Sequence, residues 1–434
     1  MNKRNIVLIT LDSVRADHCS FMGYDRKTTP TIDKMAKKGL CFTNAVSPSH
    51  TTLPSMKAIF TGKFLDQEET TLEGVRKRLL KEFKVQTTIS EIFRNKGYST
   101  IGFSLNAWTS SYFGFNRGFD YFEDSFLRNS ILSRLYNNLF NKIGELRLFS
   151  NLRNLKNLIL RDEVFSPWEK YYKVIIKRLE NIKEPFFLWV FLLDTHIPYF
   201  SPSNVRKWSS FVDMNLLNIY YTWKMERNDF IVDLHERARK VLINAYDDSI
   251  LYSDLFINKL WNDLEKFDPI FVIHADHGEG FNEHGTYGHY HPYLYQENVH
   301  VPLIIYNTEI KKRVDKPFSL LNLYSILPKL AENYVEIEDI TKDDFVVSKA
   351  FGRDKKTRVS VRIGNWKFIT GQKDEDELYN LAKDPNEREN IISDHSDLVK
   401  EMRKIIKRYI GSEEVNIVRK TVYSIRNRSR YYEN

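Results

Sequence analysis

The stretch NIVLITLDSVRADH, residues 5–18, decides the fold, because an almost wholly apolar run ends in a carboxylate at Asp12. Two later stretches repeat this arrangement: PFFLWVFLLDTH at residues 185–196 and IFVIHADHG at residues 270–278. Apolar runs of this kind are typical of strands that helices cover on both faces. The carboxyl ends of parallel strands meet at one edge of a sheet, where ligands bind. We therefore expect the polar residues after these three runs to gather at one site, where they can share one divalent cation.

Helical patterns alternate with these runs along the first 335 residues. We predict helices at residues 32–39, 85–96, 170–182 and 232–261, and further strands at residues 98–103 and 301–306. A capping box formed by Thr88 and Glu91 supports the second helix. This alternation predicts an α/β fold with a doubly wound, mostly parallel sheet flanked by helices.

The pattern changes after about residue 335 to short alternating strands, at residues 345–349, 360–363 and 366–370, and a helix near residues 398–410. This change predicts a small antiparallel α+β unit at the C-terminal end. We divide the chain into an α/β catalytic domain (1–335), a small antiparallel C-terminal domain (336–395) and a basic helical tail (396–434).

The net charge of +8 is concentrated in two segments. Residues 126–161, which we interpret as a helical insertion, contain seven Lys or Arg and one acidic residue, and residues 400–434 contain ten and four. Segments of this kind favour an anionic substrate or a peripheral contact with a membrane through the insertion; the alternative is a solvated charged surface. No nucleic-acid-binding motif accompanies them, so no nucleic acid partner is expected.

The first residues and the lengths of the apolar runs indicate where in the cell the protein resides. No run approaches the ~18 apolar residues that span a bilayer, and the first residues lack the long apolar region of a signal peptide. Two cysteines, Cys19 and Cys41, form no disulfide framework and are predicted to be core residues. These features predict a cytoplasmic protein.

The segment SHTTLPSMKAIFTG, residues 49–62, places Thr52 at the start of a predicted helix. Pro54 fits the first turn of that helix. A hydroxyl at this position faces free backbone N–H groups and the positive end of the helix dipole, which stabilise an alkoxide or a bound anion. The alternative is that Thr52 only caps the helix.

Together these segments resemble the sulfatase branch of the alkaline phosphatase superfamily over nearly the whole chain. Further collinear stretches that carry the resemblance are TTPTIDKMAKKGLCFTNAV, GYSTIGF, FGFNRGFDYFED, YQENVHVPLIIY and DELYNLAKDPNERENI. The resemblance implies one bound cation, Mn, Zn or Ca. The implied metal ligands are Asp12, Thr52, Asp276 and His277. The implied catalytic residues are Thr52, His196 and His289, and the implied substrate-binding residue is Asn106. An imidazole ligand favours Mn or Zn over Ca.

The chain departs from the family pattern at several positions. Position 52 is threonine where sulfatases have the cysteine that becomes formylglycine, and Met56 stands where that motif has arginine. Ser13 replaces a second carboxylate ligand, and FSLNAW at 103–108 lacks the family's paired Lys and His. Threonine as the nucleophile resembles the phosphotransferases and phosphodiesterases of the superfamily.

Three functions remain open. The first is a metal-dependent hydrolase that takes an anionic sulfate or phosphate ester, glycan- or lipid-linked, through a covalent Thr52 intermediate. The second is a phosphoethanolamine- or phosphoglycerol-type transferase acting on lipid or glycan. The third is a non-catalytic binding descendant of the fold. Further histidines have predicted structural roles: His274 and His300 in the core, and His50, His284 and His291 in loops. The alternative for His50 is a place at the rim of the site.

Overall fold

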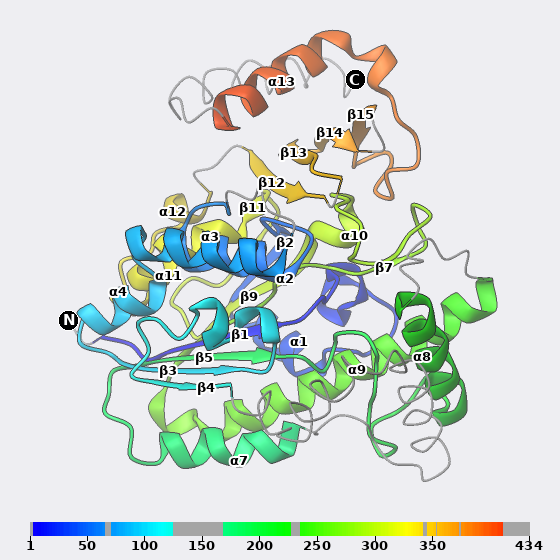
Figure 1. Cartoon of the computed structure of the whole chain (residues 1–434). Coiled ribbons are helices and arrows are strands. Elements are labelled where there is room, and N and C mark those ends of the chain that lie inside the picture. Colours follow the sequence, from blue (N-terminus) through cyan, green and yellow to red (C-terminus); the bar gives the residue numbers. More distant parts are fainter. Residues whose placement is uncertain are drawn as a thin grey trace.

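The computed structural model describes residues 3–65, 71–124, 168–226, 235–341, 345–352, 354–372 and 375–410. A nine-stranded sheet runs through its centre in the order β10-β2-β9-β6-β1-β5-β3-β4, and β11 pairs with β2 (Figure 1). Its strands are β1 (Ile6–Leu11), β2 (Leu40–Val46), β3 (Ser99–Ser104), β4 (Tyr121–Glu123), β5 (Phe186–Leu192), β6 (Ile270–Ala275), β9 (His300–Tyr306), β10 (Lys312–Val314) and β11 (Phe318–Ser319). The first strand of the chain therefore lies in the middle of the sheet.

The three apolar runs form the adjacent central strands β1, β5 and β6. β1 pairs in parallel with β5 on one side and with β6 on the other. Every residue of these strands is buried. β9 runs antiparallel to both of its neighbours, β2 and β6. The predicted α/β fold with a mostly parallel sheet is therefore confirmed.

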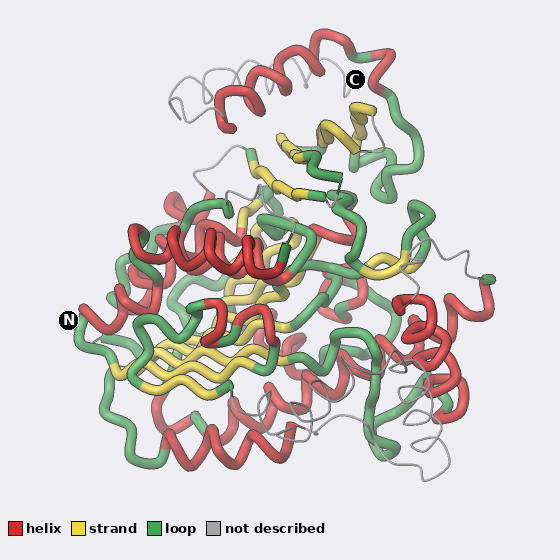
Figure 2. The backbone as a smooth tube through the Cα atoms, viewed as in Figure 1, coloured by secondary structure: helices red, strands yellow, loops and turns green. Residues whose placement is uncertain are grey.

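Helices cover both faces of the sheet (Figures 1 and 2). One face carries α2 (Thr52–Thr61), α3 (Leu72–Val85), α4 (Ile89–Asn95) and α11 (Leu323–Ala331), and the other carries α1 (Pro30–Ala36), α7 (Trp168–Leu179) and α9 (Glu236–Asp263), against which α8 (Phe211–Glu226) packs. Aromatic rings join the layers. Phe60 of α2 meets Trp189 of β5 with ring centroids 4.6 Å apart, and Phe93 of α4 stacks on Phe187 at 4.4 Å.

Short elements complete the α/β domain. They are η1 (Ala16–His18), η2 (Ser20–Met22), η3 (Ala107–Thr109), η4 (Ser111–Phe113), η6 (Glu265–Phe267), η7 (Leu320–Asn322), α10 (Gln296–Val299), α12 (Ile337–Thr341) and the hairpin of β7 (Gly280–Phe281) and β8 (Tyr287–Gly288). Cys19 and Cys41 are buried free thiols, as predicted.

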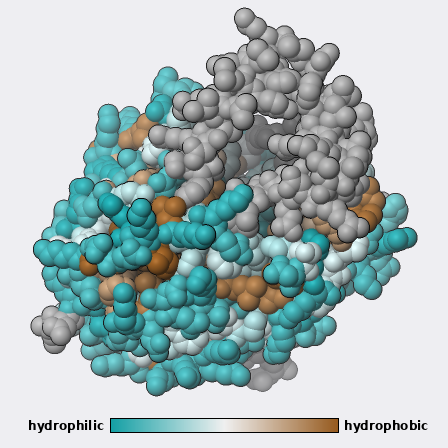
Figure 3. All heavy atoms as spheres, turned by 90° about the horizontal axis from the view of Figure 1, so that it is seen from below, coloured by the Kyte–Doolittle hydropathy of each residue, from teal (hydrophilic) through white to brown (hydrophobic). Residues whose placement is uncertain are grey.

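On the side of the molecule on which α7 lies, the coloured part of the surface is mostly hydrophilic, and its hydrophobic residues form separate patches (Figure 3). Among the helices of the described residues, none combines the length and the apolar character needed to cross a membrane. The predicted helical insertion at residues 126–161 lies outside the described residues, so the membrane contact proposed for it stays a prediction.

The C-terminal domain is an antiparallel sheet in the order β12-β13-β14-β15. Its strands are β12 (Val346–Phe351), β13 (Thr357–Ile363), β14 (Trp366–Gln372) and β15 (Glu375–Asn380), followed by η8 (Ile392–Asp394). One face of this sheet packs on the α/β domain, where Val346 and Ile369 belong to one apolar cluster with Leu294 and Val299. The small sheet is therefore fixed beside the loops that follow β6.

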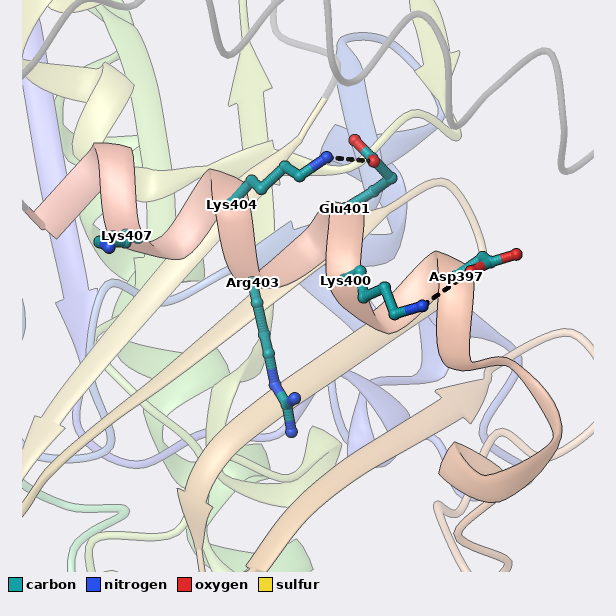
Figure 4. A pocket seen from close by; sticks show the side chains of 6 residues that line it. All are labelled: Asp397, Lys400, Glu401, Arg403, Lys404 and Lys407. Atoms are coloured by element: carbon teal, nitrogen blue, oxygen red, sulfur yellow. Dashed lines mark hydrogen bonds and ion pairs between the residues drawn. The ribbon is translucent and has the colours of Figure 1, made fainter.

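Helix α13 (Ser396–Ile410) covers the other face of the small sheet. Its residues Val399, Met402 and Ile405 are buried in one apolar cluster with the sheet. Its basic residues include Lys400 and Lys404, which pair with Asp397 and Glu401 (Figure 4). The first part of the predicted tail (396–434) is thus a helix of the domain's apolar core, and residues 411–434 lie outside the described residues.

Candidate functional site

Two carboxylates lie side by side at the carboxyl edge of the central sheet. In the pairing of β1 with β6, Leu11 is opposite Ala275, so Asp12 and Asp276 follow the two strands at the same level. The backbone N–H of Ser13 donates to Asp276 Oδ1 at 3.0 Å. Ser13 adopts a left-handed conformation with φ of 50°. The turn after β1 therefore holds the second carboxylate in place.

His277 completes a set of three buried donors. One ligand atom from each of Asp12, Asp276 and His277 lies within 4.8 Å of the others, and all three side chains are fully buried. Nδ1 of His277 donates to the carbonyl oxygen of Gly278 at 2.8 Å. The Nε2 lone pair therefore points toward the carboxylates, 3.8 Å from Asp12 Oδ1 and 3.5 Å from Asp276 Oδ2.

The electrostatics of this set suit a cation. Burial, and then repulsion by Asp276, raise the pKa of Asp12 well above its ordinary value. Burial lowers the pKa of His277 and so favours the neutral imidazole that binds metals. Oδ2 of Asp276 is buried and has no hydrogen-bond partner among the described residues. A divalent cation that prefers mixed oxygen and nitrogen ligands would satisfy this oxygen.

Thr52 lies beside this set, as the first residue of α2. Its hydroxyl donates to His277 Nε2 at 3.3 Å and lies 3.5 Å from the side-chain amide of Asn106. The sequence predicted that Thr52 would lie at the start of the helix; the cap residue itself is Thr51. The hydroxyl thus faces both the donor set and the N-terminal end of a helix dipole.

Asn106 is held by two hydrogen bonds. Its Nδ2 donates to Asp12 Oδ2 at 2.6 Å, and its Oδ1 accepts from the backbone N–H of Trp108 at 2.8 Å. The structure therefore brings the predicted substrate-binding amide next to Thr52 and also gives it a part in orienting Asp12.

His196 and His289 lie together on the open side of the site. Their ring centroids are 5.2 Å apart, and the ring of His289 lies 4.4 Å from that of His277. With Thr52 they line a cavity of about 360 Å³. All of the predicted site residues are therefore neighbours in space.

The Glu279 carboxylate, which the sequence analysis missed, is fully buried behind His289. Its Oε1 lies 2.9 Å from His289 Nδ1, and its Oε2 accepts from the Tyr199 hydroxyl at 3.0 Å. Burial raises the pKa of Glu279 to about 7, while burial and then His196 lower the pKa of His289 to about 3. Both shifts favour a neutral pair that shares one proton.

Asp194 differs from the expectation, and His50 takes the alternative position at the site. Asp194 lies away from the donor set, because its carboxylate accepts a hydrogen bond from Tyr171 of α7 at 3.0 Å, and burial raises its pKa to about 6. His50 lines the cavity beside Thr52 in addition to lying in a loop. The end of a strand could be read from the sequence, but the direction of each side chain could not.

His274 and His284 have the predicted structural roles, whereas His300 is hydrogen-bonded in β9 but only half-buried and not in the core. His274 is buried in β6 and lies 3.0 Å from the Thr10 hydroxyl, and His300 Nε2 donates to a backbone carbonyl of β2 at 2.8 Å. His284 lies 2.5 Å from Glu297 and donates through Nε2 to the carbonyl of Glu387 at 2.9 Å. His284 thus joins the loop after β6 to the C-terminal domain.

His284→Asn is expected to lower the free energy of unfolding by roughly 1–3 kcal/mol at pH 6. Burial opposes the charge of His284, but the hydrogen bond and charge of Glu297 raise its pKa above 6.5. A raised pKa adds stability that is complete below pH 6.5 and is lost as pH rises through the folded-state pKa. Urea unfolding of both proteins should therefore show a smaller difference at pH 9.

His235→Asn is the matched control, because His235 is exposed at the start of α9 and its side chain caps nothing. It should change stability little at either pH. An equal loss for His284→Asn at pH 6 and pH 9 would show that the charge of His284 contributes nothing to folding.

Comparison with known proteins identifies the family of this chain. The family model described as Sulfatase matches residues 4–341, which include every residue of the site. The chain belongs to the sulfatase family. A sulfatase of Formosa agariphila is 21% identical to it over 89% of this chain and 82% of the relative. An N-acetylgalactosamine-6-O-sulfatase of Bacteroides thetaiotaomicron is 20% identical over 93% and 92%.

The fold of this sulfatase-family chain is also found among solved structures. The phosphonate monoester hydrolase of Agrobacterium radiobacter superposes with a TM-score of 0.68, over 94% of this chain and 96% of that chain, at 16% identity. This similarity shows an alkaline phosphatase-like fold and agrees with the fold class predicted from the sequence.

Proposed function

We propose that this protein hydrolyses sulfate or phosphate esters and that Thr52 is the nucleophile. The observation that carries the proposal is the position of the Thr52 hydroxyl, 3.3 Å from the Nε2 of His277 at the start of α2. Cysteine is absent from this position, so formylglycine cannot form there. The sulfatase fold is thus combined with an ordinary hydroxyl as the attacking group.

Asp12, Asp276, His277 and Thr52 are the residues that would hold a divalent cation, and the unpartnered Oδ2 of Asp276 supports this assignment. A cation bound there would lower the pKa of the Thr52 hydroxyl and offset negative charge on the ester. Nitrogen from His277 favours Mn or Zn over Ca, whose usual ligands are all oxygen.

Thr52 attacks after its proton has passed to solvent. Its Oγ1 forms a bond to the phosphorus or sulfur atom while the bond to the leaving oxygen breaks, and that oxygen takes a proton from His289 Nε2. Water then attacks the same atom and gives a proton back to His289 as the bond to Thr52 breaks. The N-terminal end of α2 favours the negative charge on Oγ1 in both steps.

Glu279 supplies the proton that His289 passes on. Its Oε1 lies 2.9 Å from Nδ1, and His289 but not Glu279 is among the described residues that line the cavity. As Nε2 releases its proton to the leaving oxygen, the proton shared with Glu279 moves to Nδ1. The pair therefore delivers a proton without placing a full positive charge in a buried site.

Glu279→Gln is expected to slow hydrolysis of esters with poor leaving groups, such as alkyl esters, by roughly 100-fold. The amide can still hydrogen-bond Nδ1 but cannot pass on a proton. Esters of p-nitrophenol, whose leaving oxygen needs little protonation, should lose only a few-fold. Measuring kcat for a series of leaving groups tests this difference.

Glu283→Gln is the control for that variant. Glu283 lies in the same loop and pairs with Arg15 at 2.6 Å and Arg239 at 3.2 Å, away from His289. Its variant should keep the leaving-group dependence of the unaltered protein. A uniform loss across all leaving groups in Glu279→Gln would mean that Glu279 only supports the structure.

The proposal is tested by turnover of p-nitrophenyl sulfate, p-nitrophenyl phosphate and bis-p-nitrophenyl phosphate with added Mn²⁺ or Zn²⁺. An N-acetylgalactosamine sulfate belongs in the same panel, because the name of one relative specifies it. Mass spectrometry of protein quenched during turnover should find one phosphoryl or sulfuryl group on Thr52. Turnover with an unmodified Thr52 peptide would overturn the assignment, and absence of both turnover and bound metal would favour a binding module.

A further inference from the structure

The cavity beside Thr52 has a polar end and an apolar wall. The polar end is formed by Thr52, His50, His196 and His289. The apolar part of the lining consists mainly of Leu53, Pro54, Leu72, Val75, Trp108, Tyr290, Pro292 and Phe351. We infer that this wall binds the alcohol portion of the substrate, and that the substrate is the ester of an uncharged, apolar, ring-containing alcohol. The inference rests on the proposed function of the site.

The wall leaves large apolar side chains in contact with water. Leu72 at the start of α3 is 54% exposed, and Trp108 in η3 is 45% exposed. Both line the cavity that reaches Thr52. Large apolar groups gathered at the mouth of a polar site are typical of ligand-binding surfaces, because a ligand that covers them releases their ordered water.

The wall is also held rigidly relative to the reacting group. The backbone N–H of Trp108 donates to Asn106, whose amide lies 3.5 Å from the Thr52 hydroxyl. The Trp108 ring packs against Phe113, with ring centroids 5.3 Å apart. A flat ring that packs on Trp108 is therefore bound in the same cavity as the Thr52 hydroxyl.

The described residues that line the cavity include no Lys, Arg, Asp or Glu. A second sulfate or phosphate on the substrate would lose its hydration there without gaining a cationic partner, which is costly. The many hydroxyls of a sugar chain would likewise find few partners along Leu72, Val75 and Phe351. A volume of about 360 Å³ lies at the lower end of the roughly 300–1,000 Å³ of small-molecule sites, so a compact two-ring group suits it.

Binding of sulfonates, which the protein cannot hydrolyse, tests the inference separately from turnover. Calorimetry on the full chain loaded with Mn²⁺ should show 2-naphthalenesulfonate binding roughly tenfold or more tightly than methanesulfonate, because burying on the order of 60 Å² of apolar surface is worth about tenfold. 2,6-Naphthalenedisulfonate should bind more weakly than the monosulfonate. Equal affinity for 2-naphthalenesulfonate and methanesulfonate would overturn the inference.

Two variants locate the effect on the wall. Trp108→Ala should remove most of the preference for 2-naphthalenesulfonate and raise KM for a 2-naphthyl ester roughly tenfold, with kcat nearly unchanged. Trp108→Phe should keep both the preference and the KM of the unaltered protein. Leu72→Lys should make the disulfonate bind better than the monosulfonate. Val85→Lys is its control, because Val85 is 81% exposed at the far end of the same helix.

The outcomes separate this inference from the proposed function. If Trp108→Ala leaves KM and the sulfonate preference unchanged, the apolar wall does not bind the substrate, even when turnover depends on Thr52. If turnover does not depend on Thr52 while 2-naphthalenesulfonate still binds through Trp108, the proposed nucleophile is wrong and the apolar subsite remains.

Discussion

Thr52→Ala is expected to reduce turnover of sulfate and phosphate esters by roughly 10⁴-fold or more, as removal of a nucleophile does in other hydrolases. Alanine places no atom where the hydroxyl now lies, 3.3 Å from His277 Nε2. The fold should persist, since the side chain of Thr52 makes no cap for α2. Initial rates with a p-nitrophenyl ester, together with thermal unfolding, test both expectations.

Thr61→Ala provides the control at the other end of the same helix. The Thr61 hydroxyl donates to the carbonyl of Lys57 at 2.8 Å, away from the cavity. Its variant should lose a little stability and retain turnover. Full activity of Thr52→Ala would contradict the proposal and would direct attention to the adjacent hydroxyl of Thr51.

Asp276→Asn is expected to abolish stabilisation by Mn²⁺ or Zn²⁺, which for the unaltered protein should reach about 2.7 kcal/mol at a metal concentration 100 times Kd. Oδ1 of Asp276 accepts from the backbone N–H groups of Ser13 and His277 at 3.0 and 2.9 Å. The side-chain amide of Asn keeps both hydrogen bonds only if its oxygen takes the position of Oδ1. Its NH₂ group then occupies the position of Oδ2, where it cannot bind a cation.

The same geometry predicts an opposite change in the metal-free protein. The NH₂ group of Asn at position 276 can donate toward His277 Nε2, which lies 3.5 Å from Oδ2, and the repulsion between the carboxylates at positions 12 and 276 is removed. Without metal, the variant should therefore unfold at a higher temperature than the unaltered protein. Thermal unfolding with a chelator and with added metal measures both changes.

Asp254→Asn is the matched control. Asp254 is also a buried carboxylate that accepts from two backbone N–H groups, those of Thr31 and Ile32 at the start of α1. Its variant should lose stability and keep the shift caused by metal. An unchanged metal shift in Asp276→Asn would place the cation elsewhere.

The central strands could be predicted because each is a single apolar run with no competing helical period. β6 spans all the residues of the third run that precede Asp276, and β5 ends at Leu192, one residue before the second apolar run ends. β2 was missed because Thr43 and Asn44 interrupt its apolar pattern, and its conformation depends on pairing with β9. The antiparallel direction of β9 has no local signal.

The boundary between α3 and α4 was predicted wrongly from the sequence. The capping box of Thr88 and Glu91 is present, but it begins α4 rather than lying inside the helix predicted at 85–96. Residues Leu72–Val85 form a separate helix, α3. The extended conformation of Gln86 separates the two, and nothing in the periodicity of the sequence marks that break.

The metal-ligand candidates could be predicted because they follow apolar strands, and the histidines because the resemblance includes them. The place of Glu279 in the site could not be predicted from the sequence. Its carboxylate is oriented by a hydrogen bond from Tyr199, which is 80 positions away in sequence. A carboxylate in a loop gives no spacing signal for such a contact. The position of Asp194 shows the converse, because a polar residue after a strand can point to the opposite side.

The last residue of β12, Phe351, and Gly352 beyond it form part of the rim around Thr52, although they lie beyond the family match that ends at 341. The backbone N–H of Lys349 also donates to the carbonyl of Pro48, just before the turn that carries Thr52. The smaller module therefore contributes Phe351 and Gly352 to a cavity whose other lining residues, Trp108 and Leu72 among them, belong to the α/β domain. If the proposed function holds, substitutions at Phe351 alter which esters bind, while every residue proposed for the reaction stays in the larger module.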